Sequence, residues 1–422
     1  MKRRTLVLAS LAAATGAAML LKPRDRGSNH APYFLQLGDA LDRAGRSAPT
    51  LVIDKARLLT NVETLRGHLK DRFHYRIVVK SLPSLPLLDE IMVASGSRRL
   101  MLFHQPFINT VVAAMPDADI LLGKPMPVAA AARFYEQLGD AGFDAATQLR
   151  WLLDTPERVK QYAELAARLQ QPMLACIEID VGLHRGGVQR DLDLLAMLDL
   201  MTASPWLRFA GLMGYEPHIA KVPGNPLTYR DKAMAVYSHY LDLSRAHLGG
   251  AFPQDAVLNA GGSPTYQFYD EGSFPFNELA AGSCLVKPTD FDLPSLADHE
   301  AGSYIATPVL KTQDTVQIPG IDLGRLQGWW NPNQARTFFT YGGWWKAKPE
   351  SPQGLVNNGL YGRSTNQEML NGSRSVDLHP DDWIFLRPTQ SEFVFLQFGD
   401  IAVYEDGDIV DWWPVFPQGA TT

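Results

Sequence analysis

Short apolar segments alternate with helical patterns from residue 50 to about residue 262, and this rhythm limits the fold more than any other feature. The segments are nearly continuous in apolar residues, as expected for strands buried on both faces of a parallel sheet. Eight of them follow one another: TLVID (50–54), RIVVK (76–80), RRLMLF (98–103), ADILLG (118–123), LRWLLD (149–154), MLACIEID (173–180), LRFAGLMGY (207–215) and AVLNAGG (256–262). Alternating strands and helices indicate a β/α barrel or a doubly wound sheet. The count of eight, and the lack of Gly-x-Gly-x-x-Gly after the first strand, favour a (β/α)8 TIM-type barrel.

The rhythm stops after about residue 295, where Pro, Gly, Trp and Thr become dense and strand patterns take over. Three segments are predicted to form antiparallel strands: RTFFTYGGWW (336–345), EFVFLQF (392–398) and DIAVYEDGDIVDWWPVF (400–416). Asp406-Gly407 in the last segment is a strong signal for a tight hairpin turn. The C-terminal part is therefore predicted to be an all-β domain.

The chain has 422 residues, too many for one ordinary core, so more than one domain is expected. We predict a barrel over residues 50–295, a β domain over 296–422, and an N-terminal segment, 31–49, that packs on the β domain. Residues 1–30 have the layout of an export signal or membrane anchor, with a basic start before an apolar stretch. Arg3-Arg4 loosely fits a twin-arginine signal, so an exported, periplasmic or inner-membrane-tethered protein is expected.

Charge and cysteine content exclude several function classes. The formal net charge is −6, so the chain lacks the excess of positive charge that is typical of nucleic-acid-binding proteins. The two cysteines, Cys176 and Cys284, lie in apolar segments with no spacing that suggests a disulfide framework or a zinc site. We expect two buried free thiols and a small-molecule partner.

Chemically active side chains follow the predicted strands at the points where the strands end. In β/α barrels, catalytic groups gather at the C-terminal ends of the strands. The candidates here are an amine, a guanidinium, two imidazoles, a phenol and a glycine-rich loop with hydroxyl groups: Lys80, Arg185, His184, His218, Tyr215, Gly261, Gly262, Ser263, Thr265 and Tyr266.

Each candidate also has an ordinary structural explanation. Lys80 can simply reach solvent with its charged end. Arg185 can form an ion pair with Asp180 or Glu178, and the two histidines can be hydrogen-bonded loop residues, because they share no ligand-like spacing with a third group. The functional interpretation gains weight only from the combination.

The combination points to one cofactor. A glycine pair after a strand lets backbone N–H groups approach a phosphate closely. A lysine amine in a partly desolvated position can form a Schiff base. A phosphate cradle together with such a lysine describes a site for pyridoxal 5'-phosphate.

These residues resemble those of a known group, the fold-type III pyridoxal phosphate enzymes, which have an alanine-racemase-like barrel and a C-terminal β domain. The chain is most similar to the D-threonine aldolase and D-serine dehydratase branch. The resemblance covers most of the chain after the leader and rests on matching segments in the same order: TLVIDKARLLTNVETL, YRIVVKS, IEIDVGLHRGGV, GLMGYEPH, LNAGGSPTY and NELAAGSCL.

The resemblance implies a role for each residue. Lys80 would hold the cofactor as an aldimine and move protons at the substrate Cα. Arg185 would lie beside the cofactor ring, and the neutral phenol of Tyr215 would face the ring nitrogen. The phosphate would be bound by the loop, namely Gly261, Gly262, Ser263, Thr265 and Tyr266. Such enzymes are usually homodimers.

The chain departs from this branch where the branch binds a divalent metal. The family segment Pro-Ser-His-x-Cys/Asp corresponds to RPTQSEF here, so Gln390 replaces the histidine and Glu392 the second ligand. Glutamine is a poor zinc ligand, whereas Glu392 can bind a harder ion through oxygen. A solvated strand residue is the preferred interpretation of Glu392, which places the metal, and with it β-elimination and aldol cleavage, in question.

Three functions follow from these observations. The first is a pyridoxal-phosphate-dependent lyase or aldolase that acts on a D-amino acid. The second is a metal-independent amino-acid racemase, in which Lys80 serves one face of the substrate and His184 or His218 serves the other. The third is a non-catalytic protein that binds the cofactor or another small ligand.

Overall fold

The computed structural model describes residues 22–140, 142–315 and 328–417. The chain forms two compact units. The barrel unit is built from Ile53–Gly302, Gln390–Ile401 and the residues from Trp412 on. The sheet unit is built from the residues up to Val52, Ser303–Thr389 and Ala402–Asp411. The chain therefore returns to the barrel unit twice after leaving it, which a simple division at residue 295 does not capture.

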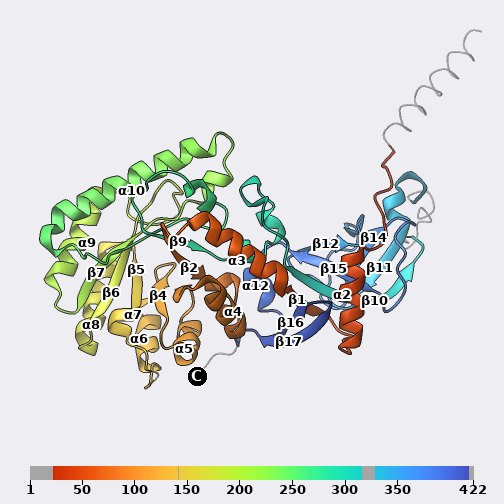
Figure 1. The fold of residues 1–422 in the computed structure, drawn as a ribbon, viewed down its shortest axis with the longest axis horizontal. Helices are drawn as coiled ribbons and strands as arrows, with labels where there is room; N and C mark the ends of the chain where they lie inside the picture. The colour runs from red at the N-terminus through yellow and green to blue at the C-terminus, as the bar shows by residue number, and fades with distance from the viewer. Residues whose placement is uncertain (1–21, 141, 316–327, 418–422) are drawn as a thin grey trace, which may run out of the picture. The chain divides into compact units, whose positions relative to one another are not determined.

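Eight parallel strands close the barrel in the order in which they occur in the chain. Figure 1 shows these strands on the inside, with helices on their outer side. The strands are β2 (His74–Val78), β3 (Arg99–Leu102), β4 (Asp119–Leu122), β5 (Leu149–Leu153), β6 (Met173–Glu178), β7 (Leu207–Met213), β8 (Val257–Ala260) and β9 (Glu278–Ala281). The last strand pairs with the first through His74 and Glu278, and the predicted TIM-type barrel is thereby confirmed.

One strand was assigned to the wrong sheet by the sequence pattern. β1 (Thr50–Asp54), predicted as the first barrel strand, instead lies between β10 (Ser303–Gln313) and β16 (Asp400–Glu405) in the other sheet. Every residue of β1 is buried, as in a barrel strand, so burial alone does not distinguish the two locations. The eighth barrel strand is β9, whose sequence ELAA is short and rich in alanine and so gives a weak strand signal.

The helices connect successive strands: α3 (Lys55–Leu69), α4 (Leu85–Ser95), α5 (Gln105–Ala114), α6 (Val128–Glu136), α7 (Ala145–Gln148), α8 (Pro156–Leu169), α9 (Asp191–Ala203) and α10 (Pro226–Leu248). α8 shows why these residues fold as they do. The side chain of Thr155 caps the helix by accepting from the N–H of Arg158, and Pro156 occupies the first turn. Gln170 ends it in a left-handed conformation with φ 52°.

The sheet unit contains a nine-stranded sheet. Its other strands are β11 (Arg336–Thr340), β12 (Ala347–Ser351), β13 (Val356–Asn357), β14 (Met369–Gly372), β15 (Trp383–Pro388) and β17 (Asp408–Pro414). The pairings of β10 with β11 and with β15 are antiparallel. The helix α2 (Pro32–Arg43) belongs to this unit, and its Asp42 accepts a hydrogen bond of 2.8 Å from the indole of Trp383. The predicted C-terminal β domain is confirmed as an antiparallel sheet.

The predicted hairpin at Asp406-Gly407 joins β16 and β17, and both residues have positive φ, 50° and 90°, as a type I′ turn requires. The predicted strand EFVFLQF is wrong. Residues Ser391–Phe395 form the helix α12, which begins at the N-cap Gln390.

The predicted leader falls mostly on residues 1–21, outside the part of the chain that the structure describes. No helix among the described residues is long and apolar enough to cross a membrane.

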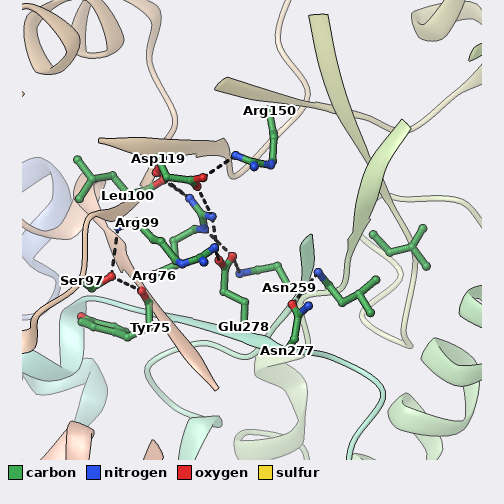
Figure 2. Close-up of polar contacts among 12 residues, drawn as sticks. Tyr75, Arg76, Ser97, Arg99, Leu100, Asp119, Arg150, Asn259, Asn277 and Glu278 are labelled. Carbon is green, nitrogen blue, oxygen red and sulfur yellow. Dashed lines mark hydrogen bonds and ion pairs between the residues drawn. The ribbon is translucent and has the colours of Figure 1, made fainter. Parts of the chain in front are cut away.

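An ion-pair cluster fills the barrel at the N-terminal end of its strands (Figure 2). Arg76 on β2 is fully buried and donates to Glu278 Oε2 at 2.8 Å and to Asp119 Oδ1 at 2.6 Å. Arg99 also donates to Glu278 Oε2, at 3.1 Å, and Arg150 donates to Asp119 Oδ2 at 2.7 Å. Every strong charge therefore has a partner, which is the condition for burying ions in a core.

Candidate active site

A cavity lies at the opposite end of the barrel, where the strands end. About 540 Å³ of space lies between its walls, including open solvent at its mouth. Of the predicted site residues, the following line it: Lys80, Arg185, Tyr215, Gly261, Gly262 and Ser263. The structure thus brings the amine, the guanidinium, the phenol and the glycine loop to one place, although they come from distant parts of the sequence.

Lys80 lies two residues beyond the end of β2, in the short 3-10 helix Val79–Ser81. Its Nζ is 2.7 Å from Glu392 Oε1 and 4.7 Å from the centre of the Phe103 ring. Its side chain is 37% exposed, so the amine opens to the cavity rather than reaching freely into solvent.

Glu392 enters the cavity from the first turn of α12. The expected strand is wrong, because Glu392 lies on a helix, where its side chain is 39% exposed and forms an ion pair with Lys80. No group of three or more His, Cys, Asp or Glu side chains in the described ranges is arranged to hold a metal ion.

Arg185 and Tyr215 form a stacked pair. The guanidinium carbon lies 5.2 Å from the centre of the phenol ring, a cation–π distance. Burial raises the pKa of Tyr215 to about 12, although Arg185 opposes this shift. The phenol is therefore neutral at physiological pH.

Glycines form a cradle on one side of the cavity. Gly261 has φ +80°. A Cβ on Gly262 would lie 2.9 Å from the Tyr215 ring, and one on Gly282 would lie 2.6 Å from the carbonyl oxygen of Val78. Only glycine fits at these positions, so the backbone stays open to a ligand.

Ser263 ties the two glycine segments together. Its Oγ accepts hydrogen bonds from the N–H groups of Gly282 and Cys284, at 3.0 Å and 3.1 Å. Gly282 and Ser283 also line the cavity but were not predicted as site residues. Their Gly-Ser sequence directly after an apolar segment, like that of Gly262-Ser263, was the signal that could have identified them.

Thr265 and Tyr266 do not line the cavity. Both are buried behind the glycine loop, where Thr265 Oγ1 lies 3.3 Å from Glu216 and the Tyr266 hydroxyl 3.1 Å from His299. The structure therefore gives them supporting contacts.

Glu216 is a residue that the sequence did not single out. It is fully buried next to Tyr215, and its Oε1 accepts hydrogen bonds from the Tyr269 hydroxyl at 3.0 Å and from the Thr265 hydroxyl at 3.3 Å. Burial raises its pKa to about 7. Its Oε2 has no hydrogen-bond partner among the described residues. Glu216 thus supports the glycine loop through Thr265.

His184 and His218 lie away from the cavity lining. His184 is 78% exposed, and its Nδ1 binds Asp180 at 2.8 Å. Burial lowers the pKa of His218, whose Nδ1 has no hydrogen-bond partner within the described part of the chain. The structure does not bring either imidazole to Lys80.

The residues of the cavity fit pyridoxal 5'-phosphate. The glycine cradle, which any Cβ would obstruct, offers backbone N–H groups to a phosphate. The Lys80 amine shares the cavity with that cradle and is accessible to an aldehyde. The neutral phenol and the guanidinium supply a flat, polar neighbour for an aromatic ring.

Solved structures with this fold include three informative relatives. D-threo-3-hydroxyaspartate dehydratase from Delftia sp. HT23 has a TM-score of 0.69 at 16% identity, covering 88% of this chain and 99% of that chain. D-threonine aldolase from Filomicrobium marinum has a TM-score of 0.67 at 15% identity, covering 87% and 96%. Alanine racemase from Bacillus anthracis has a TM-score of 0.65 at 14% identity, covering 87% and 98%. At these identities the likeness establishes the shared fold.

The search of curated proteins found no match. The family of the alanine racemase N-terminal domain, in contrast, matches residues 53–290, which contain the whole closed barrel. The chain therefore belongs to the alanine racemase N-terminal-domain family, the fold-type III pyridoxal phosphate enzymes.

Proposed function

We propose that the protein is a pyridoxal-phosphate-dependent enzyme that acts on a D-amino acid as a lyase or aldolase. The observation that carries this proposal is the placement of the Lys80 amine and the glycine cradle in one cavity. The cofactor, when bound, supplies an electron sink for negative charge that develops at the substrate Cα.

The chain's own residues would do the following. Gly262 and Ser263 would bind the phosphate through backbone N–H groups, and Lys80 would hold the cofactor covalently. Lys80 would also take or return the proton at the substrate Cα. Arg185 would hold Tyr215 in place, so that a neutral group rather than a cation faces the ring.

The direct contact between Lys80 and Glu392 favours a lyase over a two-base racemase. A racemase of that kind needs proton-transfer groups on opposite faces of Cα. Lys80 and Glu392 are 2.7 Å apart and therefore approach a substrate from the same side. On one side, the lysine can serve Cα while the carboxylate exchanges a proton with a hydroxyl on Cβ.

The names of two structural neighbours support the substrate class. A D-threonine aldolase and a D-threo-3-hydroxyaspartate dehydratase are both named for D-amino acids with a hydroxyl group on Cβ. The shared fold and the same-side pair make this class the first to test.

The premise is tested by cofactor uptake. We expect the purified protein to be yellow and Lys80→Ala to lose the visible band, with a loss of any activity of about a thousandfold or more. Lys160→Ala, an exposed lysine on α8, is the matched control and should keep the band. A colourless wild-type protein that takes up no pyridoxal phosphate would refute the proposal.

The reaction class is tested with substrates. The holoprotein is incubated with D-threonine and D-serine, with their L-forms as controls, and with and without divalent metals. Release of aldehyde, oxo acid or ammonia from a D-form supports the lyase. Inversion accompanied by solvent deuterium at Cα, without any cleavage, would instead establish the racemase.

Two further parts of the proposal concern assembly and location. We propose a homodimer, as is usual in this family, and an exported or membrane-tethered location, supported by the leader-like first 30 residues. Light scattering of the purified protein and fractionation of cells check these two points.

A further inference from the structure

Glu392 places a negative charge in a cavity that also contains two basic side chains. Among the described residues that line it, Glu392 is the one acid, and Lys80 and Arg185 are the two bases. The Arg185 guanidinium is stacked on Tyr215, and Lys80 is held by Glu392 itself. A substrate that reaches Lys80 therefore lies directly beside the Glu392 carboxylate, whereas the Arg185 guanidinium stands over the Tyr215 ring.

We propose that Glu392 selects substrates by side-chain charge, admitting amino acids with neutral or cationic side chains and rejecting those with a second carboxylate. This inference rests on the proposed function, and it narrows the substrate class of the same site.

The short distance between Lys80 and Glu392 brings any substrate that reacts at Lys80 close to the Glu392 carboxylate. The substrate Cα must come within contact of the lysine amine, and Glu392 Oε1 lies 2.7 Å from that amine. A carboxylate one or two bonds from Cα would then stand within a few ångströms of Glu392. Two negative charges at such a short distance repel each other strongly in a partly desolvated site, and the repulsion is weaker at high salt.

The remaining wall offers little compensation to a second carboxylate. The Phe103 ring lies next to the Lys80 amine, with its centre 4.7 Å from Nζ. The hydroxyl groups of Ser81 and Ser283 are 2.9 Å apart and bind each other, and Ser263 already accepts two backbone N–H groups. A neutral amide or hydroxyl loses less hydration free energy in this environment than an anion does, and the anion also lies beside the Glu392 carboxylate.

The same geometry favours a cation. An aromatic face and a carboxylate together already hold one ammonium group, that of Lys80. A substrate ammonium group brought to this place would find the same two partners.

The test uses D-aspartate and D-asparagine, which match in shape and differ in charge. Their dissociation constants for the holoprotein are measured from the change in the visible cofactor band and by calorimetry, without requiring turnover. We expect wild type to bind D-asparagine at least about tenfold more tightly than D-aspartate. Glu392→Gln should reduce this ratio to below about threefold, chiefly by improving the binding of D-aspartate.

The matched control is Glu157→Gln, which removes an exposed acid from the first turn of α8 and should leave the ratio unchanged. A second variant, Glu392→Asp, keeps the charge and should keep the discrimination. In wild type, raising the salt concentration from about 0.02 M to about 1 M should lower the ratio by about threefold or more, which needs no variant.

A wild-type ratio below about threefold, a ratio that Glu392→Gln leaves unchanged, or no dependence on salt would overturn the inference. These failures differ from failure of the proposed function. A protein that takes up the cofactor, loses it on Lys80→Ala and binds both ligands equally refutes the charge selection alone. A protein that takes up no cofactor refutes the shared premise.

Discussion

The two ends of the barrel each contain an ion pair, and both pairs begin from the same stretch of chain. Arg76 on β2 pairs with Glu278, and Lys80, four residues later, pairs with Glu392. Both side chains of the first pair are fully buried, whereas those of the second are 37% and 39% exposed. Both are pairs of a cation and a carboxylate, but one is closed off from solvent and the other is open to it.

The number of partners separates the two pairs. Arg76 donates to two carboxylates and to the carbonyl oxygens of Leu100 and Asp119, so it has no capacity left. Lys80 has one carboxylate and an aromatic face. A saturated cation stabilises a fold, whereas a cation with a single exposed partner can exchange that partner for a ligand.

The largest expected effect comes from breaking the buried pair. Arg76→Met should lower the free energy of unfolding by about 3–5 kcal/mol, because it leaves Glu278 and Asp119 buried with fewer cations. Urea unfolding followed by circular dichroism measures this loss. Adding Glu278→Gln should recover part of it, and a loss below about 1 kcal/mol would contradict the structural role of the cluster.

A smaller effect is expected from Glu216, which is buried and forms no ion pair with any residue that the structure describes. Burial raises its pKa from the ordinary value of 4.5 to about 7, so the folded chain retains a proton that the unfolded chain releases. Its contribution to stability is therefore full below pH 4.5 and is lost as the pH rises to about 7. Glu216→Gln removes this titration and should gain up to about 3 kcal/mol relative to wild type across that window.

Comparing wild type with Glu216→Gln isolates the titration of Glu216, because the two proteins share all other titrating groups. Urea unfolding of both proteins at several pH values gives the difference. A difference that stays constant with pH would mean that the pKa of Glu216 is the same in the folded and unfolded chains.

The smallest effect is expected from Lys80→Met, the same change of a cation to methionine made at the open end. Because the pair is more than a third exposed, its loss should change the free energy of unfolding by less than about 1 kcal/mol. The cofactor band should nevertheless disappear. A loss of stability as large as that of Arg76→Met would show that Lys80 is structural.

The sequence predicted the end of the barrel that contains the cavity better than the end that contains the buried ion-pair cluster. Lys80, Tyr215 and the Gly261-Gly262 loop follow directly after apolar strands, so their positions could be read from the strand pattern. Arg76 and Glu278 lie within strands, where nothing local indicates that two charged side chains meet across β2 and β9.

Long-range contacts account for the other differences. The role of Glu216 depends on its contacts with Thr265 and Tyr269, about 50 residues later in the chain. The segment EFVFLQF has the composition of a strand, but most of it forms the helix α12, which belongs to the barrel unit. His184 and His218 follow strands as predicted, yet their side chains lie away from the cavity lining.

The late return of α12 has a consequence for how the cavity is made. Lys80 and the glycine cradle are translated by residue 283, but Glu392 is added only after the strands β10 to β15 have been synthesised. On the ribosome, the nascent chain therefore carries the Lys80 amine without Glu392 for more than 100 residues of elongation. The carboxylate that pairs with the lysine is one of the last features of the cavity to be produced.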